Sequence, residues 1–130
     1  MALALNRLKG EFAAEVLDLE LPVDDAAFAQ VEAAWQRHPI LVFRDLRMTP
    51  EQHIAFAEKI APININRFFK AAPGHPQIAE VRKEPDQKTN IGGGWHTDHS
   101  YDQIPAMGSI LLAREVPPRG GDTLFASMSL

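Results

Sequence analysis

Residues 95–98, Trp-His-Thr-Asp, carry the side chains in this sequence whose types and spacing best suit metal chemistry. His96 and Asp98 are two positions apart, and on a β-strand such residues project from the same face because successive side chains alternate. An imidazole nitrogen and a carboxylate oxygen that project together supply two ligands of the 2-His-1-carboxylate triad, which holds iron in non-heme Fe(II) oxygenases. The tripeptide alone is a weak signal, because His-x-Asp arises often by chance.

The second histidine of such a triad is not evident. His99, on the same expected strand, would point away from His96 and Asp98 and is expected at the rim of the site. The upstream histidines fall on helix or loop segments and are expected to be structural or solvated. A cupin-like zinc protein using His96, Asp98 and His99 is an alternative. Zinc prefers a closed tetrahedral set, which three clustered residues on one strand do not easily supply.

Composition limits the classes of protein to consider. A chain of 130 residues can form one domain with a real core. The formal net charge is −4, and the sequence contains no block of lysines or arginines. Both observations argue against nucleic-acid or anionic-membrane partners. There is no cysteine, which excludes thiolate metal sites and disulfides and fits a cytoplasmic location. No segment approaches the length of a membrane span.

The first half of the chain contains signals for short strands and two helices. Residues 11–21 alternate loosely and are expected to form one or two strands. Asp24 or Asp25 is expected to cap a helix that ends near His38, and the apolar run 40–43 predicts a buried strand.

A second helix is expected to begin at a capping box. Thr49 is the cap, Pro50 takes the first helical position, and Gln52 completes the box. The helix is expected to end before Pro62 and to bury three apolar side chains, namely Ile54, Ala57 and Ile60.

Strands dominate the expected second half. Segment 64–76 is irregular, and a polar, glycine-rich loop is expected at 84–94. The strand candidates are 78–82, the segment containing His96, 106–116 and 123–128. A turn is expected at 117–122. Two helices followed by strands, without βα alternation, favour an α+β fold built on an antiparallel sheet, with a jelly roll as the candidate. A jelly roll needs about eight strands, so the sheet is expected to be incomplete.

Two longer segments of the sequence resemble a known family. Residues 91–101, Ile-Gly-Gly-Gly-Trp-His-Thr-Asp-His-Ser-Tyr, and residues 118–128, Pro-Arg-Gly-Gly-Asp-Thr-Leu-Phe-Ala-Ser-Met, resemble the TauD/TfdA (taurine dioxygenase) family of Fe(II)/2-oxoglutarate-dependent dioxygenases. Residues 41–45 and 49–52 also match that family's N-terminal region. The resemblance implies a double-stranded β-helix (jelly-roll, cupin-like) core with flanking helices. It further implies that residues 1–130 are the N-terminal part of a single domain, whose C-terminal half is absent.

The resemblance also implies roles for particular residues. His96 and Asp98 would be the catalytic iron ligands, and Thr123 would bind the distal carboxylate of 2-oxoglutarate. A buried carboxylate needs donors to offset its desolvation, so a hydroxyl there is physically sensible. The family's second histidine ligand and its 2-oxoglutarate-binding arginine lie well beyond the Thr123 position. The implied cofactors and partners are Fe(II), 2-oxoglutarate, O2 and a small-molecule substrate, and a homo-oligomer is compatible with the family.

The substrate is a further expectation from the resemblance. Taurine-hydroxylating members place a histidine, a tyrosine and an asparagine where this chain has Asn66, Phe69 and Gly92, so taurine itself is disfavoured. Asn66 and Phe69 are expected to line a pocket for another small organic acid, of the sulfonate, sulfate ester or aryloxyalkanoate class. The reaction implied is hydroxylation of a C–H bond with release of succinate and CO2. The alternatives are a catalytically inactive fragment and a non-enzymatic cupin-like binding protein.

Overall fold

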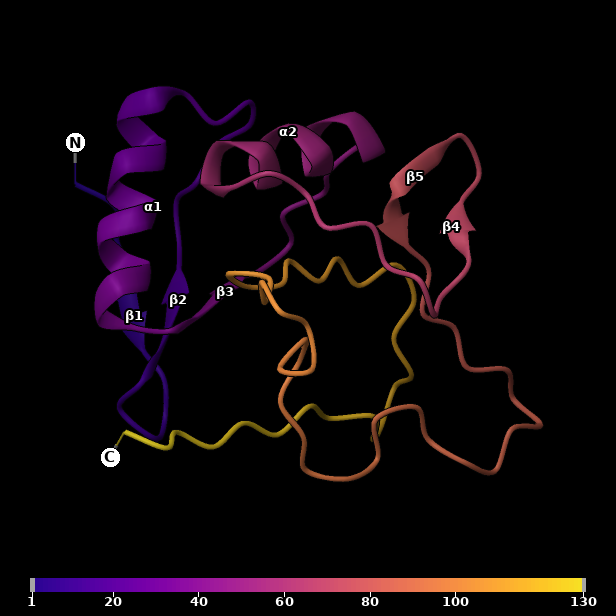
Figure 1. The fold of residues 1–130 in the computed structure, drawn as a ribbon. Helices are drawn as coiled ribbons and strands as arrows, with labels where there is room; N and C mark the ends of the chain where they lie inside the picture. The colour runs from indigo at the N-terminus through magenta and orange to yellow at the C-terminus, as the bar shows by residue number, and fades with distance from the viewer. Residues whose placement is uncertain (1, 130) are drawn as a thin grey trace. The chain divides into compact units, whose positions relative to one another are not determined.

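The computed structural model describes residues 2–129, and the chain divides into two compact units (Figure 1). The first unit comprises the N-terminal residues through Gln52 together with the segment from Leu112 onward, and the second comprises His53–Leu111. Within residues 2–129, no helix is long and apolar enough to cross a membrane. The described elements are α-helices and small sheets, which agrees with the α+β class.

The first unit is built on a three-stranded sheet of β1 (Leu5–Arg7), β2 (Ala13–Val16) and β3 (Ile40–Phe43), in the order β1-β2-β3. The strands predicted within 11–21 and at 40–43 are confirmed, but all four residues of β3 are half-buried, so the prediction that this strand is buried is wrong. β1 was not predicted. β2 lies in the centre, antiparallel to β1 and parallel to β3. Its central place explains why most of its side chains are buried.

Helix α1 (Asp25–Arg37) connects β2 to β3 and contacts β3 (Figure 1). The Asp24 carboxylate accepts a hydrogen bond from the Ala27 backbone N–H at 2.7 Å, so the predicted cap is confirmed. Val31 and Ala34, one turn apart, are the buried side chains of this helix. Because α1 carries the chain back across the sheet, β3 runs parallel to β2. The prediction of an antiparallel sheet is therefore wrong for this pair.

Helix α2 (Pro50–Ile60) begins at the predicted capping box. The Thr49 hydroxyl accepts from the Gln52 N–H at 3.2 Å, and the Gln52 side-chain oxygen accepts from the Thr49 N–H at 3.0 Å. The buried side chain is Phe56, so the expected burial of three smaller apolar residues is wrong, and Ile54, Ala57 and Ile60 are half-buried. The largest apolar side chain sets the buried face of the helix.

The second unit contains a hairpin of β4 (Ala71–Ala72) and β5 (His75–Ala79). The strand predicted over 78–82 therefore begins earlier and ends at Ala79. The turn explains the shift, because Gly74 takes a φ of +75° and a tight turn at this position fixes which residues pair.

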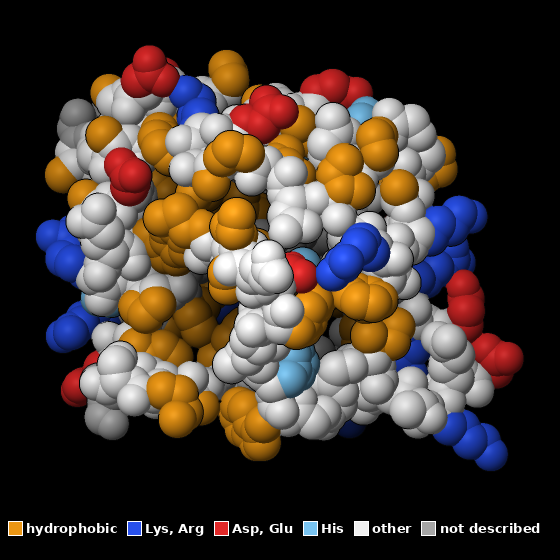
Figure 2. All heavy atoms as spheres, viewed as in Figure 1, with side chains coloured by type: hydrophobic (Ala, Val, Ile, Leu, Met, Phe, Trp, Pro, Cys, Tyr) orange, Lys and Arg blue, Asp and Glu red, His pale blue; other side chains and the backbone are white. Residues whose placement is uncertain are grey.

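The strands predicted around His96, at 106–116 and at 123–128 are wrong. Within residues 2–129 these segments are turns or irregular backbone and belong to neither sheet. A strand requires hydrogen bonds to a neighbouring strand, which the described residues do not offer to these segments. Most of their large apolar side chains are exposed, and Figure 2 shows how widely hydrophobic side chains reach the face in view. The most exposed are Trp95, Leu111, Val116 and Met128.

Candidate metal and substrate site

His96 and Asp98 face each other in the loop that follows the glycine run. The His96 Nε2 atom lies 3.3 Å from Asp98 Oδ1, and the two side chains are 55% and 64% exposed. The strand that was predicted to align them is absent, so the local fold of the loop brings the two donor atoms together. The structure thus places an imidazole nitrogen beside a carboxylate oxygen at a position open to a ligand.

The shorter of two contacts to His96 favours a proton on Nδ1, because the Gly94 carbonyl is closer to this nitrogen than the Asp98 carboxylate is to Nε2. The Nδ1 atom lies 2.7 Å from the Gly94 carbonyl oxygen, which can only accept a hydrogen bond. Nδ1 therefore donates, and in the neutral imidazole Nε2 carries the lone pair. Histidines that bind metals are typically held in this way, with the second ring nitrogen donating to a carbonyl or carboxylate. The ring is oriented for coordination through Nε2, the atom that faces Asp98.

Gly92 makes room for this ring. Its φ is +66°, a region that favours glycine, and a Cβ added there would lie 3.1 Å from His96 Cε1. Both the backbone conformation and the neighbouring ring require the absence of a side chain. In the sequence, Gly92 stood out only as a departure from the taurine pattern, and its role beside His96 was missed. The glycine run before the motif was the one signal that pointed to a close approach of backbone and side chain.

The donor pair fits two adjacent positions around an iron ion. Neighbouring ligands of an octahedral ion with bonds of roughly 2.1 Å lie about 3.0 Å apart, close to the His96–Asp98 separation of 3.3 Å. Among residues 2–129, no three His, Cys, Asp or Glu side chains form a group that could hold a metal. His99 has a φ of +55°, and its Nδ1 atom lies 3.0 Å from an Asp102 carboxylate oxygen. The three-residue zinc set of the alternative hypothesis is therefore not assembled.

Asn66 and Phe69, the two substrate candidates, lie in one loop of the second unit. The Asn66 side-chain oxygen accepts from the backbone N–H groups of Phe68 at 2.8 Å and Phe69 at 3.0 Å. This is an Asx turn, in which the side chain shapes the backbone. Asn66 therefore determines how the loop presents Phe69, and its own contact with a substrate stays a prediction.

Phe69 borders a surface hollow that combines apolar and cationic side chains. The hollow is lined by Phe69, Lys70, Glu80, Arg82 and Ile91. A backbone hydrogen bond from the Glu80 N–H to the Lys70 carbonyl, at 2.8 Å, extends the hairpin and brings its two ends together. Lys70 and Arg82 were missed because only the hairpin register makes neighbours of residues so far apart in sequence. Lys70 and Arg82 bring positive charge to the apolar wall. Glu80 and the Glu84 carboxylate, which lies 2.6 Å from Arg82 Nε, bring negative charge to the same place.

The other sequence candidates have simpler surroundings. Thr123 is exposed and follows a glycine turn in the first unit, where Gly120 and Gly121 have φ values of +75° and +76°. Its contact with 2-oxoglutarate stays a prediction. The His53 ring lies 3.0 Å from the Ile110 carbonyl, which agrees with a structural role for this histidine.

Comparison with known sequences decides the family. Residues 4–130 match the family described as "Taurine catabolism dioxygenase TauD, TfdA family". The chain belongs to the TauD/TfdA family. The resemblance noted in the sequence motifs is thereby confirmed.

Two TauD/TfdA relatives illustrate the similarity. The chain is 34% identical over 125 residues to the (S)-phenoxypropionate/alpha-ketoglutarate-dioxygenase of Sphingobium herbicidovorans, covering 93% of this chain and 44% of the relative. It is 31% identical over 147 residues to the alpha-ketoglutarate-dependent 2,4-dichlorophenoxyacetate dioxygenase of Cupriavidus pinatubonensis, covering 98% of this chain and 51% of the relative. The chain therefore spans about half the length of these relatives.

One solved structure is also similar in sequence over part of the chain. The crystal structure of AAD-2 in complex with Mn(II) and N-oxalylglycine is 36% identical, covers 44% of this chain and 20% of that chain, and superposes with a TM-score of 0.41.

Proposed function

We propose that the protein carrying this chain is an Fe(II)- and 2-oxoglutarate-dependent dioxygenase that hydroxylates a C–H bond of a small organic acid. Release of succinate and CO2 would accompany the hydroxylation. The observation that supports this most directly is the His96–Asp98 pair, with the imidazole oriented through Nδ1 and the two donor atoms 3.3 Å apart. Membership of a family whose named relatives are such dioxygenases supports it independently.

Each residue of the site has a distinct task in this proposal. His96 Nε2 and Asp98 would hold Fe(II), which, together with 2-oxoglutarate and O2, would supply the oxidising chemistry. The Gly94 carbonyl would hold the proton on Nδ1, so that the lone pair of Nε2 is available to the metal. Gly92 has no side chain that would contact the His96 ring. Thr123 would donate a hydrogen bond to the distal carboxylate of 2-oxoglutarate. The complete domain would be a double-stranded β-helix with the described helices at its flank.

An aryloxyalkanoate is the substrate class that the surface hollow suits best. Phe69 and Ile91 would contact the aryl ring, and Lys70 would attract the carboxylate, joined by Arg82 when the substrate replaces Glu84 as its partner. The relatives named above take their names from a phenoxypropionate and a dichlorophenoxyacetate. Sulfonates and sulfate esters, which other relatives are named for, are the second class because they offer the same negative charge.

The deciding experiment for metal binding is an anaerobic titration of the 130-residue chain with Fe(II) and 2-oxoglutarate. We expect the visible metal-to-ligand charge-transfer band to appear in the wild type and to be absent from His96→Ala. His75→Ala is the matched control, because the His75 Nδ1 atom also lies close to the carbonyl two residues before it, at 3.0 Å. A band that survives in His96→Ala would refute the assignment. Absence of a band from the wild type would favour an inactive fragment.

Substrate choice is tested by turnover of the full-length protein with a phenoxyalkanoate, an alkylsulfonate and an alkyl sulfate. We expect the phenoxyalkanoate to have the highest kcat/KM. Arg82→Met should raise the KM for this substrate more than the KM for 2-oxoglutarate. Equal effects on both constants would argue against a carboxylate contact in the hollow.

A further inference from the structure

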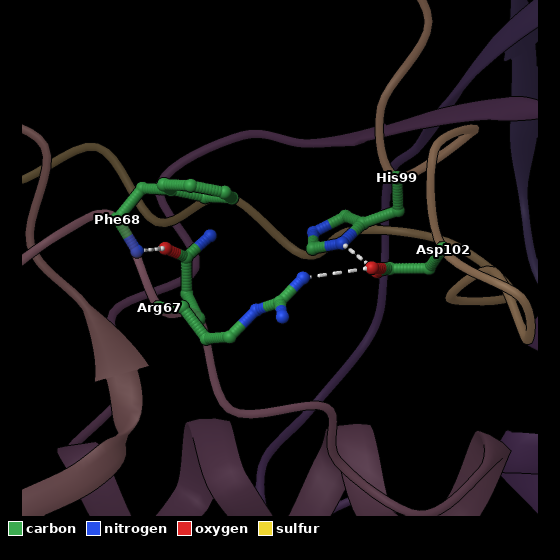
Figure 3. A network of polar contacts seen from close by, with 5 residues as sticks. Arg67, Phe68, His99 and Asp102 are labelled. Atoms are coloured by element: carbon green, nitrogen blue, oxygen red, sulfur yellow. Dashed lines mark hydrogen bonds and ion pairs between the residues drawn. The ribbon is translucent and has the colours of Figure 1, made fainter.

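Asp102 joins two loops of the second unit that are distant in sequence. One of its carboxylate oxygens accepts from Arg67 Nη2 at 3.1 Å, and the other lies 3.0 Å from His99 Nδ1 (Figure 3). Arg67 belongs to the loop shaped by Asn66, whereas His99 directly follows the His96–Asp98 motif. The Asp102 side chain is only 18% exposed, so its two bonds form in a partly desolvated place.

The turn that carries Asp102 is braced by short-range bonds. The Asp102 backbone N–H donates to the His99 carbonyl at 3.1 Å, and the Thr97 hydroxyl donates to Ser100 at 2.7 Å. Residues 97–102 therefore form a local unit that begins inside the metal motif and extends beyond it. A group that contacts Asp102 from outside is therefore attached to a turn that is already held by its own hydrogen bonds.

The loop around Arg67 contacts the turn at residues 97–102 through an ion pair and through the packing of aromatic rings. The Arg67 guanidinium lies 5.7 Å from the centre of the Phe68 ring. Phe68 packs edge-on against Tyr101, with ring centres 5.8 Å apart and an interplanar angle of 82°. The ion pair to Asp102 and this aromatic contact hold the same two loops, so the removal of Asp102 should weaken both.

We propose that Asp102 is a positioning residue, which holds the loop presenting Asn66 and Phe69 to the substrate against the turn that follows His96 and Asp98. This inference rests on the proposed function. Because the metal motif is braced locally and the Asn66–Phe69 loop is held mainly from Asp102, the loss of Asp102 affects substrate binding more than metal binding.

A matched control exists in the first unit. Arg44, in the turn directly after β3, and Glu15 of β2 form an ion pair at 3.0 Å, with side chains 65% and 16% exposed. The Arg67–Asp102 pair has almost the same values, 3.1 Å with 72% and 18%. The two pairs differ in that only Asp102 adjoins the metal motif. Glu15→Gln therefore reports the effect of losing an equivalent ion pair elsewhere.

The test has a structural arm and a kinetic arm. In the 130-residue chain, the nuclear Overhauser effect between the Phe68 and Tyr101 rings should be present in the wild type and in Glu15→Gln, and lost in Asp102→Asn. In the full-length protein, Asp102→Asn should raise the KM for the organic acid by about tenfold, while kcat and the KM for 2-oxoglutarate change by less than about twofold. Asp102→Glu, which keeps the charge, should recover most of the substrate KM.

Each outcome is decisive. A ring contact that persists in Asp102→Asn, or a substrate KM unchanged in an active enzyme, overturns the proposal. The proposal is also overturned if kcat and the affinity for 2-oxoglutarate fall as much as the affinity for the organic acid, because that pattern indicates general unfolding of the site. If the wild type shows no turnover, the proposed function fails, and the ring contact alone decides whether Asp102 positions the loop.

Discussion

Replacing Gly92 by alanine should disturb the orientation of His96 without unfolding the protein. Two features of the structure act together at this position. The backbone φ of +66° lies in the left-handed region, and the new Cβ would lie 3.1 Å from His96 Cε1. The ring cannot shift freely, because its Nδ1 atom is held by the Gly94 carbonyl at 2.7 Å. We therefore expect the alanine variant to break this bond or to leave the left-handed conformation.

The magnitude follows from the cost of each feature. A left-handed φ costs a residue with a Cβ roughly 1–2 kcal/mol. Carbon atoms prefer a separation of about 3.5–4.0 Å, so the ring contact adds to this cost. If the loop relaxes and must regain its geometry to bind a metal, metal affinity falls by about 5- to 30-fold from the strain alone. Global stability should change less, because residues 91–97 are exposed and can rearrange locally.

Two assays on the 130-residue chain measure this effect. Long-range proton–nitrogen correlation spectra at alkaline pH should show Nδ1-protonated His96 in the wild type and a mixture of tautomers in Gly92→Ala. Titration with Co(II) should show the loss of affinity. Gly74→Ala is the control for strain alone, because Gly74 has a φ of +75° and an added Cβ would meet nothing within 4 Å.

Gly93→Ala is the control for the added methyl group, since Gly93 has no left-handed φ and its nearest contact would be ordinary, at 3.4 Å. A Gly92→Ala variant that keeps the wild-type tautomer and a Co(II) affinity within about twofold would refute the reasoning. An equal loss in Gly93→Ala would show that any methyl group in this loop is harmful, independently of the His96 ring.

Three further predictions concern the metal pair and the second helix. His96→Ala and Asp98→Ala should each abolish 2-oxoglutarate-dependent turnover of the full-length protein, as measured by succinate release, and persistent turnover would contradict the ligand assignment. Thr49→Ala should lower the free energy of unfolding by about 1 kcal/mol in urea denaturation, because the capping box is lost, whereas Thr89→Ala in an exposed loop should be nearly neutral. Phe56→Ala should cost about 3–5 kcal/mol, since this side chain is only 5% exposed, and a cost below that of Thr49→Ala would show that the helix is held elsewhere.

Local chemistry explains which elements could be predicted. Both helix starts depend on hydrogen bonds within four residues, so Asp24 and the Thr49–Gln52 box could be recognised without knowledge of the fold. The apolar run Ile40–Phe43 was likewise recognisable as a strand. The burial of Phe56 was missed because the spacing of apolar residues does not tell which face of a helix meets the core.

The strands predicted after residue 95 were wrong for a different reason. The apolar runs at 106–116 and 123–128 have the composition of strands, but a strand forms only against a neighbour, and none is available to them within residues 2–129. The parallel pairing of β2 with β3 was also unpredictable from local sequence, because it depends on where α1 returns the chain.

The family and the candidate ligands could be inferred from the order of residues alone, whereas the arrangement of the side chains around them could not. Motif order and residue types were enough to indicate the family and to select His96 and Asp98, because donor atoms are a property of each side chain. Only the folded chain placed the Gly94 carbonyl on His96 and required glycine at position 92. Only the folded chain paired Arg67 with Asp102, 35 residues away, because such contacts depend on loop paths that no short window of sequence encodes.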